Sequence, residues 1–248
     1  MKPILTHVIQ VTPLTRTMLQ VFLELPEALH YKAGQYLELI LNDKQRVPLS
    51  IANAPLGGRR LELHIRHKPD NPVSIDLLST LHNQETLSIN APLGLCTIET
   101  LKPTLPIIFM ARGSGFAPIK AIIEQLLANG SQQPMHLYWG FRNVTDQYLD
   151  DLPLLWASHI ENFQYTPVLC PDELSSTDSH ITQSVMWEGR VGSLLDVIIK
   201  DYTDLSPFQL LAAGPFDLIY QARDAFIQHG LLQDNMYADA FAFLKKSN

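Results

Sequence analysis

The spacing of hydrophobic residues changes near residue 101. Before that point, short runs such as QYLELIL and LELHIR alternate apolar with polar residues, and this alternation is typical of antiparallel strands in a barrel or sandwich. One helix is expected among them, SIDLLSTLH, with Ser74 as its N-cap. The remaining strand-like runs are HVIQVTPL, TMLQVFLEL, TLSINAPLG and LCTIE.

After the proline-bearing linker TLKPTLP, strands alternate with helices. This alternation indicates a parallel sheet flanked by helices. We therefore predict two domains, an antiparallel β domain over residues 1–101 and an α/β domain over residues 102–248. The expected pairs are IIFMA with APIKAIIEQLL, MHLYWG with QYLDDLPLLWASHI, FQYTPVL with GSLLDVIIKDY, and FQLLAAG with DLIYQARDAFIQHG, followed by a terminal strand at MYADAFAFL.

Composition narrows the classes of partner. The 248 residues are 46% hydrophobic, which is enough for two modest cores. A net charge of −7, with no basic run denser than Lys245–Lys246, argues against a nucleic-acid surface. The longest strongly apolar stretch, LPIIFMA, is too short to span a bilayer.

The cysteines and histidines indicate neither a disulfide framework nor a metal site. Cys96 and Cys170 are far apart and lie in no CxxC context, which argues against zinc and iron–sulfur clusters. His64 and His67 are three apart on an expected strand and therefore face opposite sides. Because the N-terminus also lacks the unbroken apolar core of a signal peptide, we expect a cytoplasmic protein.

A glycine-rich turn follows the expected strand IIFMA. Gly113, Ser114 and Gly115 let the backbone approach a ligand closely, and a helix with Pro118 in its first turn follows at once. A strand, glycine turn and helix N-terminus in this order favour binding of a phosphate. The alternative is a tight strand-to-helix turn that binds nothing.

The next strand ends in LYWGFRN, with Arg142 where dinucleotide-binding folds place an acidic residue for the ribose 2′-hydroxyl. An arginine there suits a 2′-phosphate, which favours acceptance of NADPH. The alternative is a solvated loop arginine.

The ordered segments AGQYL, PLSIANAP, LELHIR, APLG, ARGSGFAP, LYWGFR, AAGPFDLI and YADAFAFL resemble the ferredoxin-NADP reductase superfamily over essentially the whole chain. The resemblance is strongest to its bacterial NAD(P)H:flavin oxidoreductases of the free-flavin reductase type. It implies a six-stranded antiparallel flavin-binding barrel followed by a five-stranded, Rossmann-like parallel-sheet NAD(P)-binding domain. It also implies FAD or FMN and NADH or NADPH as cofactors, with hydride passing from nicotinamide C4 to flavin N5.

In this family a serine that follows Arg-x-Tyr/Phe faces flavin N5, and Ser50 occupies that position. Ser50 is therefore the catalytic candidate; its alternative is a strand serine bonded to nearby backbone. Three departures stand out, with Val47 at the family's arginine, Leu49 at its aromatic residue and Pro72 at a glycine. The flavin-binding residues implied by the resemblance are Arg46, Pro48, Leu49, Ser50, Ile51, Ala52, His64, Ile65, Ser74 and Phe241.

In the second half, Arg112 stands where relatives have a glycine, while AAGPF matches a segment that admits the nicotinamide ring. Asp239 and Phe241 are candidates for the region where the rings stack; for Phe241, packing in a terminal strand is the alternative. The NAD(P)-binding residues implied are Gly113, Ser114, Gly115, Pro118, Arg142, Gly214, Pro215 and Asp239.

We therefore expect an NAD(P)H-dependent flavin oxidoreductase that holds FMN, FAD or riboflavin loosely. The first alternative is an FAD-containing reductase that passes electrons to a separate acceptor protein. The second is a degenerate nucleotide-binding or regulatory protein without turnover. Retention of flavin through purification separates the first two, and NADH oxidation with added flavin separates both from the third.

Overall fold

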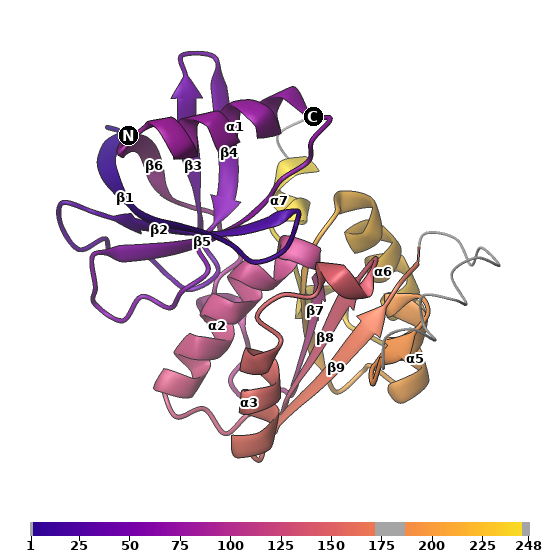
Figure 1. Cartoon of the computed structure of the whole chain (residues 1–248). Coiled ribbons are helices and arrows are strands. Elements are labelled where there is room, and N and C mark those ends of the chain that lie inside the picture. Colours follow the sequence, from indigo (N-terminus) through magenta and orange to yellow (C-terminus); the bar gives the residue numbers. More distant parts are fainter. Residues whose placement is uncertain (1, 172–186, 245–248) are drawn as a thin grey trace. The chain divides into compact units, whose positions relative to one another are not determined.

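The computed structural model describes residues 2–171 and 187–244 (Figure 1). Its contacts divide the chain into two compact units. The first comprises Met1–Leu101 and Phe116–Ser131, and the second comprises Lys102–Gly115 and Gln132–Asn248. The single boundary between residues 101 and 102 that the sequence suggests stays a prediction.

The first unit contains a six-stranded antiparallel sheet, as predicted. A bridge between Ile51 and Leu63 joins its two edges and closes it into a barrel. Leu37 and Leu39 of one strand and Leu61 and Leu63 of another are buried in its core. Along the sheet the strands follow the order β4-β3-β6-β1-β2-β5, with bounds β1 (Ile4–Pro13), β2 (Met18–Glu24), β3 (Tyr36–Asn42), β4 (Gln45–Ser50), β5 (Arg60–Arg66) and β6 (Thr86–Leu93).

Helix α1 (Pro72–Asn83) lies across one end of the barrel and packs Leu77 and Leu81 into its core (Figure 1). The prediction of Ser74 as its N-cap is wrong, because Asn71 is the N-cap and its side chain accepts a hydrogen bond from the Ser74 N–H. Pro72 occupies the first turn, where the missing N–H of proline costs nothing.

The segment LCTIE is not a strand. Gly94, with a φ of 97°, turns the chain away from β6, and Leu95 is 79% exposed. Only a short 3-10 turn, Ile98–Thr100, follows, and the Ile98 N–H donates to the Ala33 carbonyl.

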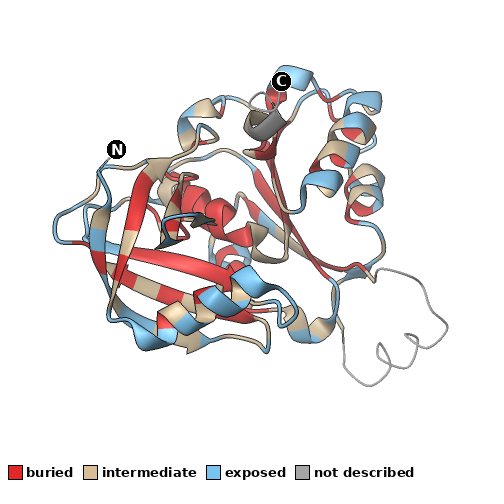
Figure 2. Cartoon of the chain, turned by 90° about the horizontal axis from the view of Figure 1, so that it is seen from above, coloured by how far each residue is buried: buried red, intermediate tan, exposed pale blue. Residues whose placement is uncertain are grey.

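Helix α2 (Phe116–Ala128) belongs to the first unit by its contacts. Its buried positions run all round the helix from Phe116 to Ile123 and include Lys120 (Figure 2). A helix that is apolar on every face is expected to be enclosed by other elements. Lys120 therefore needs partners in the interior.

The second unit contains a parallel sheet with helices, as predicted, in the order β10-β9-β8-β7-β11-β12. The resemblance implied five strands, and the sixth is the two-residue β10 (Arg190–Val191) beside β9. The other strands are β7 (Ile107–Arg112), β8 (Met135–Phe141), β9 (Phe163–Leu169), β11 (Gln209–Ala213) and β12 (Met236–Tyr237), and the helices are α3 (Asp151–His159), α5 (Leu194–Asp201), α6 (Phe216–Gln228) and α7 (Ala240–Leu244).

The long terminal strand predicted at MYADAFAFL is wrong. Strand β12 ends at Tyr237 and helix α7 begins at Ala240. The Phe241 N–H donates to the Ala238 carbonyl in a turn rather than across a ladder. Phe241 therefore lies on a helix, and its packing as a strand residue is excluded.

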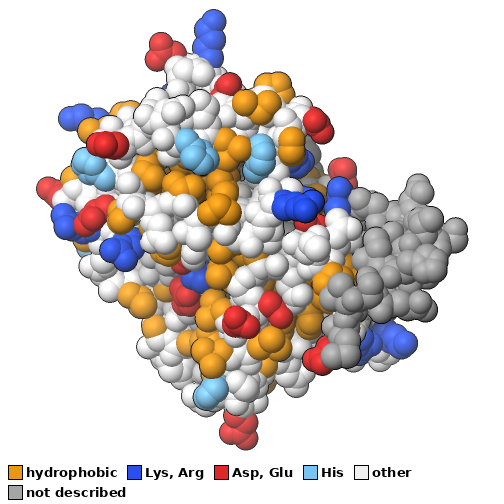
Figure 3. All heavy atoms as spheres, in the orientation of Figure 1, with side chains coloured by type: hydrophobic (Ala, Val, Ile, Leu, Met, Phe, Trp, Pro, Cys, Tyr) orange, Lys and Arg blue, Asp and Glu red, His pale blue; other side chains and the backbone are white. Residues whose placement is uncertain are grey.

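On the face of the molecule seen in Figure 3, acidic and basic side chains are interspersed. Among the described helices, none is long and apolar enough to cross a membrane. In the same residues, no group of three or more His, Cys, Asp or Glu side chains is placed to hold a metal ion.

Candidate functional site

The two faces of β4 carry different residues. Val47 and Leu49 pack against the barrel core, so alternation places Arg46, Pro48 and Ser50 on the opposite face. The ladder to β3 is regular from Arg46 to Ser50. The family's arginine position, occupied by Val47, thus faces inward, while Arg46 shares the face of Ser50.

Arg46 is at the exposed start of this face. Its guanidinium lies 3.9 Å from the Glu38 carboxylate, and its side chain is 54% exposed. Such a pair binds weakly in water, so the guanidinium is able to turn toward an anionic ligand.

Ser50 is the last residue of β4 and is half-buried. The chain continues through Ile51 and Ala52, which are fully buried. The Ile51 N–H donates to the Gln35 carbonyl, and the Ala52 N–H donates to the Glu62 carbonyl at 2.7 Å. These contacts fix the backbone on the C-terminal side of the Ser50 hydroxyl.

Four ionisable side chains cluster beside this backbone, and we call Glu62, His64, Lys120 and Glu124 the Lys120 cluster. The Lys120 ammonium contacts the Glu62 carboxylate at 2.8 Å and the Glu124 carboxylate at 2.7 Å. The other Glu62 oxygen lies 2.9 Å from His64 Nε2. Gln20 also donates to that oxygen, at 2.7 Å.

Burial and charge oppose each other in this cluster. Burial alone would raise the pKa of Glu62, but the hydrogen bond from His64 and the charge of Lys120 outweigh it and lower the pKa to about 2. Burial lowers the pKa of His64, against the opposing effect of Glu62. The surroundings therefore favour the ionised form of Glu62 and the neutral form of His64.

The residues predicted from the sequence do not include Glu62, Lys120 or Glu124. A signal was present in PIKAII, where a lysine interrupts a run of residues that is apolar on every face of the helix. Two predicted flavin residues lie on β5, with His64 on its outer face and Ile65 on its inner face. The His64 side chain is enclosed in the Lys120 cluster and stacks on Phe116, with the two ring centres 6.2 Å apart. Ile65 is buried in the barrel core.

Ser74, another of the predicted flavin-binding residues, lies in the first turn of α1. Its hydroxyl accepts a hydrogen bond from the Lys68 N–H at 2.8 Å and lies 3.1 Å from His67 Nδ1. The hydroxyl thus holds the loop that leads into the helix.

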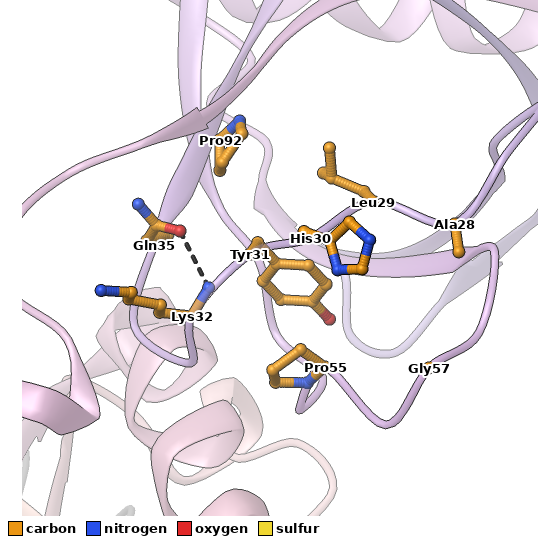
Figure 4. A pocket seen from close by; sticks show the side chains of 9 residues that line it. All are labelled: Ala28, Leu29, His30, Tyr31, Lys32, Gln35, Pro55, Gly57 and Pro92. Carbon is orange, nitrogen blue, oxygen red and sulfur yellow. Dashed lines mark hydrogen bonds between the residues drawn. The ribbon is translucent and has the colours of Figure 1, made fainter.

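A pocket of about 370 Å³ opens in the first unit beside the chain that follows Ala54 (Figure 4). The ring of Tyr31 forms one wall, and its hydroxyl donates to the Asn53 carbonyl at 2.9 Å. The predicted flavin residues do not line it. Three segments of the resemblance do contribute, since the lining comprises Ala28, Leu29, His30, Tyr31, Lys32, Gln35, Pro55, Gly57 and Pro92.

The second unit gathers a different set of residues at the carboxyl edge of its parallel sheet. The turn Gly113–Gly115 follows β7, and Gly214 and Pro215 follow the adjacent strand β11. Because β8 and β9 extend from one side of β7 and β11 from the other, the strand order reverses at this point. Ligands of open α/β sheets bind at such a switch point.

The two turns approach each other closely. A Cβ on Gly115 would lie 2.1 Å from the Ala213 carbonyl oxygen, and one on Gly214 would lie 2.9 Å from Arg112 Cβ. Gly113 has a φ of 54°, in the left-handed region. The glycines are therefore required by the backbone itself, and the turn leads directly into α2, whose first N–H groups suit a phosphate.

The carboxyl ends of three strands of this sheet carry or precede Arg112, Arg142 and Asp239. Arg112 ends β7 and donates to the Cys170 carbonyl at 3.1 Å. Arg142 follows β8 and is exposed. Asp239 follows β12, the neighbour of β11, and Phe241 packs against Tyr220 with ring centres 5.9 Å apart. Pro118 is buried in the first turn of α2.

The sequence of the chain is similar to those of known oxidoreductases. Residues 109–224 match the oxidoreductase NAD-binding domain family. A probable flavin reductase from Photobacterium leiognathi is 31% identical over 229 residues, which cover 90% of this chain and 92% of that protein.

A CDP-6-deoxy-L-threo-D-glycero-4-hexulose-3-dehydrase reductase from Yersinia pestis is 35% identical over 213 residues. The match covers 86% of this chain, which spans 60% of the length of that relative. Among solved structures, a cytochrome P450 reductase from Amycolatopsis has a TM-score of 0.83 at 23% identity, covering 96% of this chain and 69% of the other. At 23% identity, this structural similarity shows a shared fold only.

Proposed function

Because the chain belongs to the ferredoxin-NADP reductase superfamily, close to its flavin reductases, we propose that it is an NAD(P)H-dependent flavin oxidoreductase. The bound cofactors supply the redox chemistry, with hydride passing from nicotinamide C4 to flavin N5. The chain itself binds the two cofactors, orients them and excludes water. In this proposal the flavin is FMN, FAD or riboflavin, held loosely enough to exchange.

The observation that carries the proposal is the pair of close-packed glycine turns at the switch point of the sheet. They lie within residues 109–224, the part that matches the NAD-binding family. In this role Gly113–Gly115 holds the nucleotide phosphates, while Gly214 and Pro215 leave room for the nicotinamide ring. Arg142, exposed beyond β8, suits a 2′-phosphate.

On the flavin side, the proposal gives Ser50 the catalytic position. A hydroxyl can donate or accept a hydrogen bond, so it suits an atom whose bonding needs change when hydride arrives. Arg46 shares this face of β4 and is the candidate for a flavin phosphate.

The direct test is anaerobic mixing of the protein with NADH or NADPH and then riboflavin, FMN or FAD, following the loss of flavin absorbance. Bleaching of added flavin by a colourless protein supports the proposal, and absence of bleaching with every pair contradicts it. Ser50→Ala should lower turnover about tenfold, the cost of one hydrogen bond to a reacting atom. Ser79→Ala, on the exposed side of α1, is the matched control.

A second function is supported by two longer relatives, the dehydrase reductase and the P450 reductase, of which this chain spans 60% and 69%. In that case the protein keeps FAD and passes electrons to a separate acceptor protein. Yellow protein that reduces only its own flavin would favour this function over flavin exchange.

A cytoplasmic location also stays part of the proposal. A reducing compartment suits cysteines that form no disulfide within the described residues.

A further inference from the structure

The backbone immediately after Ser50 is held by an unusual set of contacts. Strand β4 ends at Ser50, and an isolated bridge from Ile51 to Leu63 is the last ladder contact. Ala52 is fully buried and Ala54 is 3% exposed. Buried peptide groups outside a sheet need other hydrogen-bond partners.

Helix α2 supplies two of these partners. The Lys120 ammonium donates to the Ala52 carbonyl at 3.1 Å, and the Ala54 N–H donates to the Glu124 carboxylate at 3.0 Å. The two side chains are four residues apart, on one face of α2, and pair with each other at 2.7 Å.

The residue between the two alanines is held as well. The Asn53 side-chain oxygen accepts from the Glu62 N–H at 2.8 Å, and its amide donates to the Arg60 carbonyl at 3.0 Å. The Asn53 carbonyl accepts from the Tyr31 hydroxyl. Ala52–Ala54 is therefore fixed from several directions without being part of a strand.

The side chains that hold Ala52–Ala54 have further partners of their own. Lys120 is 7% exposed and contacts Glu62 in addition to Glu124. Glu62 is tied to His64 and Gln20. Side chains with several fixed partners lose their freedom to rotate, so they define the position of the backbone they contact.

We propose that Lys120 and Glu124 are positioning residues for the flavin, because they fix Ala52–Ala54 and through it the end of β4 that carries Ser50. This inference rests on the proposed function and adds to it two residues on α2 that act through the backbone. The two have different consequences when removed. Loss of Lys120 leaves the buried Glu62 carboxylate without its cation, whereas loss of Glu124, which is 25% exposed, mainly releases the Ala54 N–H.

Glu124→Ala is therefore the sharper variant. A buried N–H without a partner must move or admit water, and the movement occurs within four residues of Ser50. We expect KM for riboflavin to rise about tenfold while KM for NAD(P)H stays within about twofold. Glu124→Gln, which keeps an oxygen acceptor, should recover at least half of the lost flavin affinity.

The control is Gln125→Ala, the next residue on the same helix, whose side chain bonds Asn129 instead. Hydrogen exchange of the peptide that contains Ala52–Ala54 is a readout independent of turnover. It should be faster in Glu124→Ala and unchanged in Gln125→Ala.

The outcomes separate this inference from the proposed function. If the wild type reduces flavin and Glu124→Ala leaves KM for riboflavin unchanged, the positioning role is wrong and the proposed function stands. If the wild type binds riboflavin, seen by fluorescence quenching, without reducing it, the proposed function is wrong. The riboflavin dissociation constant of Glu124→Ala, divided by that of the wild type, then tests the positioning role, and a ratio of one contradicts it. If the wild type neither binds nor reduces riboflavin, FMN or FAD, both are overturned.

Discussion

The chain after β4 and the turn after β7 are positioned in opposite ways. Ala52–Ala54 is held by the charged side chains of Lys120 and Glu124 on α2 and by the backbone of Glu62 on β5. Gly113–Gly115 is held by close backbone contact with Ala213. The first arrangement needs particular charges, while the second needs the absence of side chains.

This difference teaches where each region can tolerate change. A charged network accepts a change of shape if its charges and hydrogen bonds remain balanced, but it fails when one partner is removed. A close backbone contact does not depend on charge, but one added methyl group is enough to push the two backbone segments apart. The following substitutions test that contrast.

The largest effect is expected from Lys120→Met. It leaves the buried Glu62 carboxylate and the partly buried Glu124 carboxylate without their shared cation, and should destabilise the fold by about 3–5 kcal/mol. Urea unfolding measures this loss. Lys200→Met, at an exposed position in α5, is the control, and a loss below about 1 kcal/mol in Lys120→Met would contradict the role of the charge.

Gly115→Ala tests the opposite arrangement. The new Cβ would lie 2.1 Å from the Ala213 carbonyl oxygen, so one turn must shift, and we expect a loss of about 2–3 kcal/mol. The matched control is Gly58→Ala, where the nearest atom to the new Cβ is 3.8 Å away. Equal melting temperatures for the two variants would show that the turns separate easily.

A smaller effect depends on pH and concerns a buried histidine of the second unit. His136 lies 2.9 Å from the Tyr202 hydroxyl and 2.8 Å from the Thr166 hydroxyl. Burial lowers the pKa of His136 from 6.5 to about 4; Asp201 opposes this shift and Arg190 adds to it. As the pH falls, the unfolded chain therefore takes up a proton at His136 before the folded protein does.

The stability that depends on a neutral His136 is fully present above pH 6.5, and it is lost as the pH falls toward 4. Between about pH 7.5 and about pH 5 this histidine should remove about 2 kcal/mol of the free energy of unfolding. Urea unfolding of wild type and His136→Gln at both pH values measures it. Identical pH dependence in the two proteins would refute the assignment.

The smallest effect is expected at the start of β4. Arg46→Ala removes an exposed pair with Glu38 and should change stability by less than about 0.5 kcal/mol. If the guanidinium binds a flavin phosphate, KM for FMN should rise about threefold, while KM for riboflavin, which has no phosphate, should not change. A parallel rise for both flavins would place Arg46 outside the phosphate site.

Most of the fold could be predicted from residue periodicity. The alternation in QYLELIL and the buried runs in IIFMA and MHLYWG reflect burial that acts along a single strand. Prediction failed where local pattern and tertiary contacts disagree. AFAFL alternates like a strand but forms a helix, and Asn71 rather than Ser74 caps α1 because its side chain reaches the Ser74 N–H.

The candidate site was predictable only in part, for the same reason. The glycine turn is a local motif, so Gly113–Gly115 could be located from sequence alone. The Lys120 cluster is not local, since Lys120 and Glu62 are 58 residues apart. From sequence, Lys120 and Glu124 have the spacing of an ordinary surface ion pair, and only the fold shows that Lys120 is buried and Glu124 partly buried.

Helix α2 also governs the order in which the first unit can be completed during synthesis. Its residues, Phe116–Ser131 with the following turn, leave the ribosome only after β7 and the glycine turn, which belong to the second unit. Until then Glu62 has no Lys120 to pair with. The first unit therefore cannot be isolated by one cut in the gene; a fragment ending at Leu101 would lack the helix that neutralises its buried acid.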